Sequence, residues 1–200
     1  GLSAATCSIS EVGAARFRGG ECLGTFRTFV DAPAPVEPAV TAITGITDDM
    51  LRGAPPVEAV LPVLAEFAAG AVLVGHNLRF DVAFLDAALV ATARTAVGAR
   101  TVDTLAVARR LIGEDAPDLR LATLADALGL AHRPSHRALD DVLATADLLH
   151  VLLERAAGLG VAALDDLLDL PGLARHAPAA KLRLTTRLPR APGVYVLRDA

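Results

Sequence analysis

The stretch of the chain that decides the fold is Ala71-Val72-Leu73-Val74-Gly75-His76-Asn77-Leu78-Arg79-Phe80-Asp81. Its first five residues form an apolar run that is typical of a buried strand, and residues 82–89 have the spacing of a helix packed on a sheet. Polar residues therefore lie where a strand ends and a helix begins. Ligands bind at that edge of open α/β sheets, so chemistry is expected here.

Asp81 carries the first functional hypothesis. A carboxylate one turn into a helix, at this edge of a sheet, can serve as a ligand for a hard cation. The alternative is that Asp81 is a first-turn acid that is favoured only by the helix dipole. The stretch by itself does not decide between the two.

Composition indicates one folded domain with an appendage. The chain has 200 residues, of which 53% are apolar, and it can bury a sizeable core. No apolar run approaches the roughly 20 residues that span a membrane, and Cys7 and Cys22 lack the spacing of a metal finger or a disulfide framework. We therefore expect a reducing, cytoplasmic setting. The chain begins at Gly1 and its only methionine is Met50, which favours a fragment or a processed chain.

The charge is unevenly distributed. The net charge of −4 does not indicate a simple nucleic-acid binder. Residues 171–200 contain six basic residues and one acid, so this tail carries +5 and the preceding 170 residues carry −9. An acidic body can still act on nucleic acid if its carboxylates hold divalent metals.

The pattern of turns and apolar periods predicts an α/β fold in which helices flank a mixed sheet. Two strands come first as a hairpin, and strand–helix units follow. The predicted strands cover 8–17, 21–30, 71–75 and 99–102, and the predicted helices cover 47–53, 57–69, 80–93, 103–112, 121–128, 138–154 and 164–170.

A second polar constellation, residues 136–141, opens the longest predicted helix. Helical periodicity places Asp140 on a solvated face and Asp141 on the flank of an apolar stripe. That stripe contains Leu139, Val142, Leu143, Ala146, Leu149 and Leu153. A half-buried acid needs a partner or a metal, so Asp141 is the better functional candidate.

His136 lies at the junction between loop and helix, where an imidazole can act as a general base. The alternative is an ordinary surface histidine near the start of a helix.

These two constellations resemble the DEDDh family of 3′–5′ exonucleases, which contains the proofreading epsilon subunit of bacterial replicative polymerase. Residues 76–85 match the second motif of the family (H-N-x-x-F-D-x-x-F-L), and residues 136–141 match the third. Residues 43–51 match a loop before the first helix of the family, and residues 102–105 fit the segment between the two motifs. The resemblance covers about residues 1–155.

The resemblance implies a ribonuclease H-like fold and a site for two divalent ions, Mg²⁺ or Mn²⁺. Asp81 and Asp141 would be metal ligands, and His136 would deprotonate the attacking water. The expected partners are single-stranded DNA 3′ ends and a DNA polymerase subunit, with no membrane involved.

The resemblance also implies residues that contact the substrate. His76 and Asn77 would shape the site near the phosphate or support its ligands. Ile46, Thr47 and Phe80 would line the site for the terminal nucleotide. For Phe80 and Phe84 the alternative is core packing.

The first motif of the family, D-x-E-T-T-G, ends on a glycine that Gly1 matches. Its two acids would precede Gly1, on a strand that is central in the family fold. We therefore expect an α/β, ribonuclease H-like sheet that lacks its first, central strand, low stability, and a nearly inactive fragment.

The tail has a resemblance of its own. Residues 188–199 resemble the start of a GIY-YIG nuclease module, with Gly193-Val194-Tyr195 as its first signature triplet. The alternative is an ordinary strand after a proline-rich linker. The expected organisation is an N-terminally truncated exonuclease domain at 1–157, a helical and linker segment at 158–188, and the truncated start of a second module at 189–200.

The leading hypothesis is thus a DNA 3′–5′ exonuclease of the proofreading or repair type, fused to an endonuclease. Two alternatives remain: an RNA-trimming exonuclease of the same family, and a non-catalytic module that binds nucleic acid or a polymerase.

Overall fold

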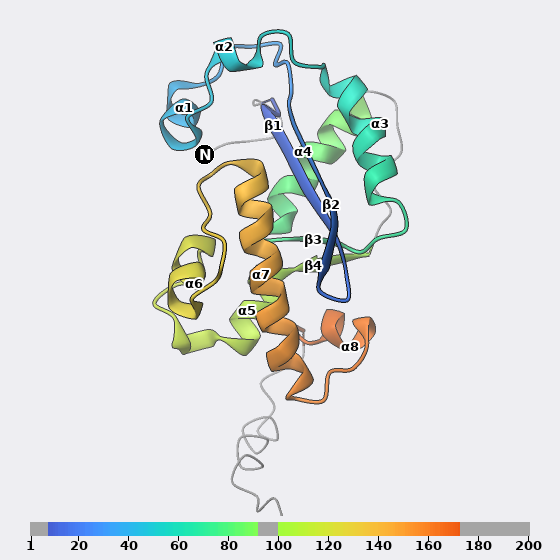
Figure 1. Ribbon diagram of the computed structural model, residues 1–200, viewed down its shortest axis with the longest axis vertical. Coiled ribbons are helices and arrows are strands. Elements are labelled where there is room, and N and C mark those ends of the chain that lie inside the picture. Colours follow the sequence, from blue (N-terminus) through green and yellow to red (C-terminus); the bar gives the residue numbers. More distant parts are fainter. Residues whose placement is uncertain (1–7, 92–99, 173–200) are drawn as a thin grey trace, which may run out of the picture.

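A computed structural model describes residues 8–91 and 100–172 of the chain (Figure 1). Strands β1 (Glu11–Arg18) and β2 (Glu21–Phe29) form an antiparallel hairpin. Gly19 and Gly20 make its turn with φ of 58° and 86°, a region that favours glycine. The predicted hairpin is confirmed.

The second pair of strands is parallel. Strand β3 (Leu73–Gly75) pairs with β4 (Thr101–Asp103), and Gly75 lies opposite Asp103. Helix α4 (Leu78–Ala91) follows β3 directly. In the described ranges the two pairs are separate two-stranded sheets, so the predicted mixed sheet takes the form of two ladders. The parallel register brings the carboxyl ends of β3 and β4 to one edge.

The other helices follow the predicted order, with two additions, α1 and a short 3₁₀ turn. Helix α1, which is short and contains no buried residue, was not predicted by the periodicity. The helices are α1 (Pro38–Thr44), α2 (Asp48–Leu51), α3 (Val57–Ala68), α5 (Thr104–Leu111), the 3₁₀ turn η1 (Gly113–Asp115), α6 (Leu121–Leu128), α7 (Ala138–Ala157) and α8 (Leu164–Asp169).

Two apolar clusters lie on the two sides of the molecule. The larger joins α5, α6, α7 and α8 and includes Leu124, Leu152 and Leu167. The smaller joins the hairpin to α3 through Val12, Val30 and Val60. Helix α7 runs through the middle of the molecule and contacts β1, α5 and α6 (Figure 1).

The buried face of α7 differs from the predicted stripe. Thr145, Leu148 and Leu152 are buried, whereas Leu153 is 40% exposed. The predicted stripe was therefore right only in part: Ala146 is buried and Leu149 packs against the core, but the row that starts at Asp141 forms the centre of the buried face. The reason is that α7 packs between β1 and the helices α5 and α6, which rotates and widens its buried arc. The prediction that Asp141 faces protein while Asp140 faces water is confirmed, since Asp141 is half-buried and Asp140 exposed.

Within the described ranges, none of the helices combines the length and the apolar character needed to cross a membrane. Residues 188–199, which resemble the start of a GIY-YIG module, lie outside the described residues, as does the part of the predicted helical and linker segment after residue 172.

The close approach of β1 to α7 depends on Gly13. A Cβ atom at this position would lie 2.7 Å from the carbonyl carbon of Ala138 and 2.9 Å from its Cβ. Gly13→Ala therefore forces the strand and the helix apart, and we expect it to lower the free energy of unfolding by about 1–3 kcal/mol. Urea unfolding followed by circular dichroism measures this change.

Gly24→Ala is the matched control on the other strand, because its new Cβ would meet only Phe67 Cε2 at 3.9 Å. Equal stability of the two variants would contradict the packing argument.

Candidate active site

The carboxyl ends of β3 and β4 are tied together by Asp103. Its Oδ1 accepts hydrogen bonds from the backbone N–H of Asn77 and of Leu105, both at 2.9 Å. One carboxylate oxygen therefore holds the first turns of both α4 and α5. Asn77 has a φ of 62°, a left-handed conformation that asparagine tolerates better than most residues. The segment at residues 76–81 is thus held in place where it follows β3.

Both ring nitrogens of His76 contact polar groups of the protein itself. Its Nε2 lies 2.8 Å from the carbonyl oxygen of Leu119 and its Nδ1 lies 3.0 Å from Thr104 Oγ1. A carbonyl only accepts, so Nε2 carries a proton, and burial lowers the pKa of the ring, which favours the neutral form. Thr104 is fully buried and its Oγ1 also lies 3.1 Å from Gly75 O, so its one hydroxyl hydrogen is shared between that carbonyl and Nδ1 of the neutral ring. Of the two predicted roles of His76, this arrangement favours support of the site over contact with a phosphate.

Asp81 lies on the first turn of α4, among other acids. The residue as a whole is exposed. Loss of hydration at its carboxyl group, together with the negative charges of Asp103 and Asp141, raises the pKa of Asp81 to about 6. Asp81 and Asp141, which are sixty residues apart in the sequence, are therefore close enough to repel each other electrostatically.

The start of α7 folds back on Asp141. Its Oδ1 accepts the backbone N–H of Ser135 at 3.0 Å and that of His136 at 3.1 Å. Burial raises the pKa of Asp141 in spite of these two bonds. His136 is exposed and has a φ of 61°. Asp140, in contrast, binds only the hydroxyl of Ser135, at 2.5 Å, on the solvated face.

The charge of His136 lowers the pKa of Asp141 but does not outweigh the effect of burial. In the part of the chain that the structure describes, neither Asp81 nor Asp141 forms an ion pair with arginine, lysine or histidine. Close carboxylates without cationic partners are the donor set expected for a divalent cation. The described residues contain no group of three or more acidic, histidine or cysteine side chains that could hold a metal ion by themselves.

The family of the chain follows from its sequence. The family model described as an exonuclease (RNase_T) matches residues 1–149. The chain belongs to this exonuclease family.

Two relatives set this exonuclease domain in context. A Mycobacterium tuberculosis protein, named as a bifunctional exonuclease/endonuclease, is 41% identical over 192 residues, which cover 96% of this chain and 30% of the relative. The PolC-type DNA polymerase III of Caldanaerobacter subterraneus is 36% identical over 167 residues, which cover 84% of this chain and 12% of the polymerase. The chain therefore spans less than a third of the length of these relatives.

Solved structures confirm the ribonuclease H-like exonuclease fold. Exonuclease X in complex with 5′ overhanging duplex DNA matches with a TM-score of 0.64 at 22% identity, covering 82% of this chain and 90% of that one. The zinc-bound form of an Escherichia coli exonuclease I complex with single-stranded DNA matches with a TM-score of 0.70 at 20% identity, covering 78% of this chain and 39% of that one.

The three residues expected near the terminal nucleotide of an exonuclease substrate differ in exposure. Ile46 is 2% exposed, whereas Thr47 is exposed and Phe80 is 41% exposed. The ring of Phe80 lies 4.9 Å from that of the partly buried Phe84. Phe80 and Thr47 are thus accessible to a ligand, and Ile46 contributes as packing beneath the surface.

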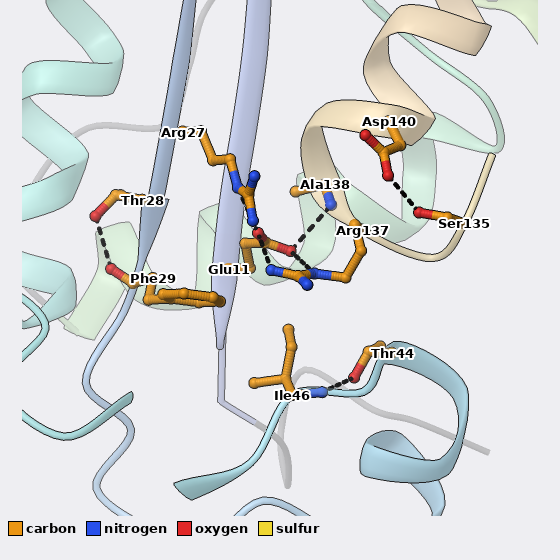
Figure 2. A network of polar contacts seen from close by, with 10 residues as sticks. All are labelled: Glu11, Arg27, Thr28, Phe29, Thr44, Ile46, Ser135, Arg137, Ala138 and Asp140. Atoms are coloured by element: carbon orange, nitrogen blue, oxygen red, sulfur yellow. Dashed lines mark hydrogen bonds and ion pairs between the residues drawn. The ribbon is translucent and has the colours of Figure 1, made fainter. Parts of the chain in front are cut away.

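Two acids with structural work were not among the predicted site residues. Asp103 is the first residue of the predicted helix 103–112, and it caps α5 by accepting a hydrogen bond from Leu105 N. Its second bond, from Asn77 N, was not predicted. Glu11 was not singled out at all. Its side chain is 4% exposed and bonds Arg27, Arg137 and Ala138 (Figure 2). The available signal was an acid on a strand two residues before a glycine.

The raised pKa of Asp81 predicts a pH-dependent stability. The folded chain holds this proton more tightly than the unfolded chain, so the free energy of unfolding falls as the pH rises from about 4 to about 6. Asp81→Asn removes this penalty. In metal-free buffer at pH 7 we expect the variant to be more stable than the wild type by about 1 kcal/mol, a figure reduced for solvent screening.

The stability difference between Asp81→Asn and the wild type should shrink below about pH 4, where the carboxyl group is protonated in both the folded and the unfolded chain. Thermal unfolding at the two pH values measures it, and Asp86→Asn on the same helix controls for the loss of a negative charge. A gain of the same size at both pH values would contradict the electrostatic argument.

Proposed function

We propose that this chain is the catalytic part of a metal-dependent 3′–5′ exonuclease that removes nucleotides from DNA 3′ ends. The observation that carries the proposal is that two acids from different elements, Asp81 of α4 and Asp141 of α7, both have raised pKa values. Burial is the main cause for each, and the charge of Asp141 adds to the effect on Asp81. Within a chain of the exonuclease family, such a pair is best explained as metal ligands.

The residues present fit a divalent cation, Mg²⁺ or Mn²⁺, since such an ion prefers carboxylate oxygens and would relieve the repulsion between them. Asp81 and Asp141 would hold it. When bound, divalent ions supply Lewis-acid stabilisation of the attacking and leaving oxygens.

The protein groups have separate tasks. Asp141 uses Oδ1 to hold the Ser135 and His136 amides, which leaves Oδ2 for the ion. His136 accepts the proton of the attacking water at a ring nitrogen, for which its exposure suits it. Asp103 and His76 keep the loop before Asp81 in place.

DNA is favoured over RNA as the substrate by the relatives above 30% identity, which include PolC-type DNA polymerases. That likeness also supports a DNA polymerase as a partner. RNA remains the alternative because a nuclease domain described as a DEDDh family member, bound to rAMP, shares the fold with a TM-score of 0.56. Parallel digestion of 3′-labelled DNA and RNA oligonucleotides separates the two.

The tail at residues 189–200 is proposed to begin a GIY-YIG-like module. The support is the match with the M. tuberculosis relative, which covers 96% of this chain and therefore extends past the exonuclease family match.

Substitution at the start of α7 tests the catalytic assignment. In the complete gene product that contains this chain, His136→Ala and Asp141→Ala should each lower kcat about 10²–10⁴-fold, because one removes the base and the other a metal ligand. Digestion of 3′-labelled single-stranded DNA with Mg²⁺ or Mn²⁺ measures the loss.

Asp140→Ala is the matched control, since Asp140 faces solvent one residue away. A larger loss from Asp140→Ala than from Asp141→Ala would overturn the assignment. Metal-independent DNA binding by a wild type that does not digest DNA would favour the non-catalytic module.

Phe80 tests the nucleotide site. Its 41% exposed ring can stack on a base, and base stacking on an aromatic ring contributes about 1–3 kcal/mol. Phe80→Ala should therefore raise KM for single-stranded DNA about tenfold or more. Leu23→Ala, which removes an exposed apolar side chain from the hairpin, should leave KM unchanged. An unchanged KM in Phe80→Ala would assign this ring to packing with Phe84.

A further inference from the structure

Glu11, the first residue of β1, is a buried and fully bonded acid. Arg27 Nε donates to its Oε1 at 2.9 Å and Arg137 Nη2 at 3.0 Å, while Arg137 Nε and Ala138 N donate to Oε2 at 3.1 and 3.0 Å (Figure 2). The side chains of Arg137 and Arg27 are 24% and 44% exposed, against 4% for Glu11. The carboxylate is thus the centre of the network.

Two of these bonds act on the start of α7. Ala138 is the first residue of the helix and Arg137 is its N-cap, whose own side chain makes no capping bond. The first N–H groups of a helix have no partner within it, and a negative charge there is favourable. Glu11 therefore caps α7 from a different element, 127 residues away in the sequence.

Aromatic packing limits the movement of the arginines. The guanidinium carbon of Arg137 lies 5.4 Å from the centre of the Phe29 ring, and that of Arg27 lies 5.9 Å from it. Phe29 ends β2, so the hairpin supplies the acid, one of the two arginines and the ring on which both arginines rest. Both strands of the hairpin therefore contact Arg137, the residue next to His136.

His136 lies in a segment that hydrogen bonds hold on both sides. The residues after it, Arg137 and Ala138, are held by Glu11, and the N–H groups of Ser135 and His136 are held by Asp141. Its φ of 61° is uncommon for a residue with a side chain. Such a conformation persists only where the surroundings impose it.

We propose that Glu11 is a positioning residue of the exonuclease reaction, which orients His136 and Asp141 through Arg137 and the first turn of α7. The inference rests on the proposed function. Glu11 itself lies behind the site and contacts no reacting group in this role.

The charge of Glu11 is needed for this role. Burial raises its pKa, but the bonds from Arg137, Ala138 and Arg27 together lower it below the ordinary value, so it stays ionised. A glutamine has the same shape and only one acceptor oxygen. Its NH₂ group would face the N–H donors of an arginine or of Ala138, so the hydrogen bonds to one of the two Glu11 oxygens would be lost.

Glu11→Gln is the test, measured in the complete gene product, with Glu21→Gln on the exposed end of the same hairpin as the matched control. We expect kcat on 3′-labelled single-stranded DNA to fall about 10–100-fold, with KM within about twofold, because misplaced groups affect the reacting geometry more than binding. The control should behave as the wild type.

Hydrogen exchange without metal gives a second readout that does not need activity. In Glu11→Gln the amides of Ser135, His136 and Ala138 should exchange faster than in the wild type, while amides in the middle of α7 stay protected. A merely destabilised fold would instead loosen all of α7. If the wild type digests no DNA, the proposed function fails, and the exchange result still decides whether Glu11 holds this loop.

Arg137→Lys covers the case in which Glu11→Gln does not fold. Lysine keeps the charge but loses the two-pronged contact, so kcat should fall and the same amides should exchange faster. Normal kcat and normal exchange at these amides in either folded variant would overturn the inference, as would an exchange increase spread evenly along α7.

Discussion

The buried carboxylate of Glu11 joins the hairpin to the start of α7, and the arrangement of the site depends on this contact. Gly13 allows the backbones to approach closely enough for the bond to Ala138 N to form. Removing a carboxylate from water costs several kcal/mol, and here two arginines and a helix amide offset that cost. Loss of one of these donors would therefore leave part of the cost of burying the Glu11 carboxylate without compensation.

The protein treats its acids in two opposite ways. Glu11 is saturated with donors and its pKa is lowered, whereas the pKa of Asp81 is raised to about 6 among other acids. The first arrangement stabilises the folded chain, and the second destabilises it. A saturated carboxylate is typical of a structural role, whereas a carboxylate with a strongly raised pKa is typical of a functional site.

Local signals in the sequence predicted most elements, and tertiary packing decided what they missed. Helix α6 and its end at Gly129 were predicted to the residue, because a left-handed glycine after an apolar period is a local signal. Helix α1 was missed because it buries no residue and so has no apolar period. The side of α7 that carries Asp141 was predicted correctly, but its apolar stripe only in part, since packing on β1, α5 and α6 is not encoded in one helix. The role of Glu11 was out of reach because its partner Arg137 lies 126 residues away.

Within residues 76–81, the first residues stabilise the fold, and their contacts determine the position of Asp81. His76 bonds Thr104 and the carbonyl of Leu119, and Asn77 bonds Asp103. The polar groups of both residues therefore link β3, β4 and α5. A strand of three residues such as β3 has few ladder bonds of its own, so polar side chains must fix the turn that follows it. Asp81, one turn later, then occupies a defined position in which no basic side chain of residues 8–91 and 100–172 forms an ion pair with it.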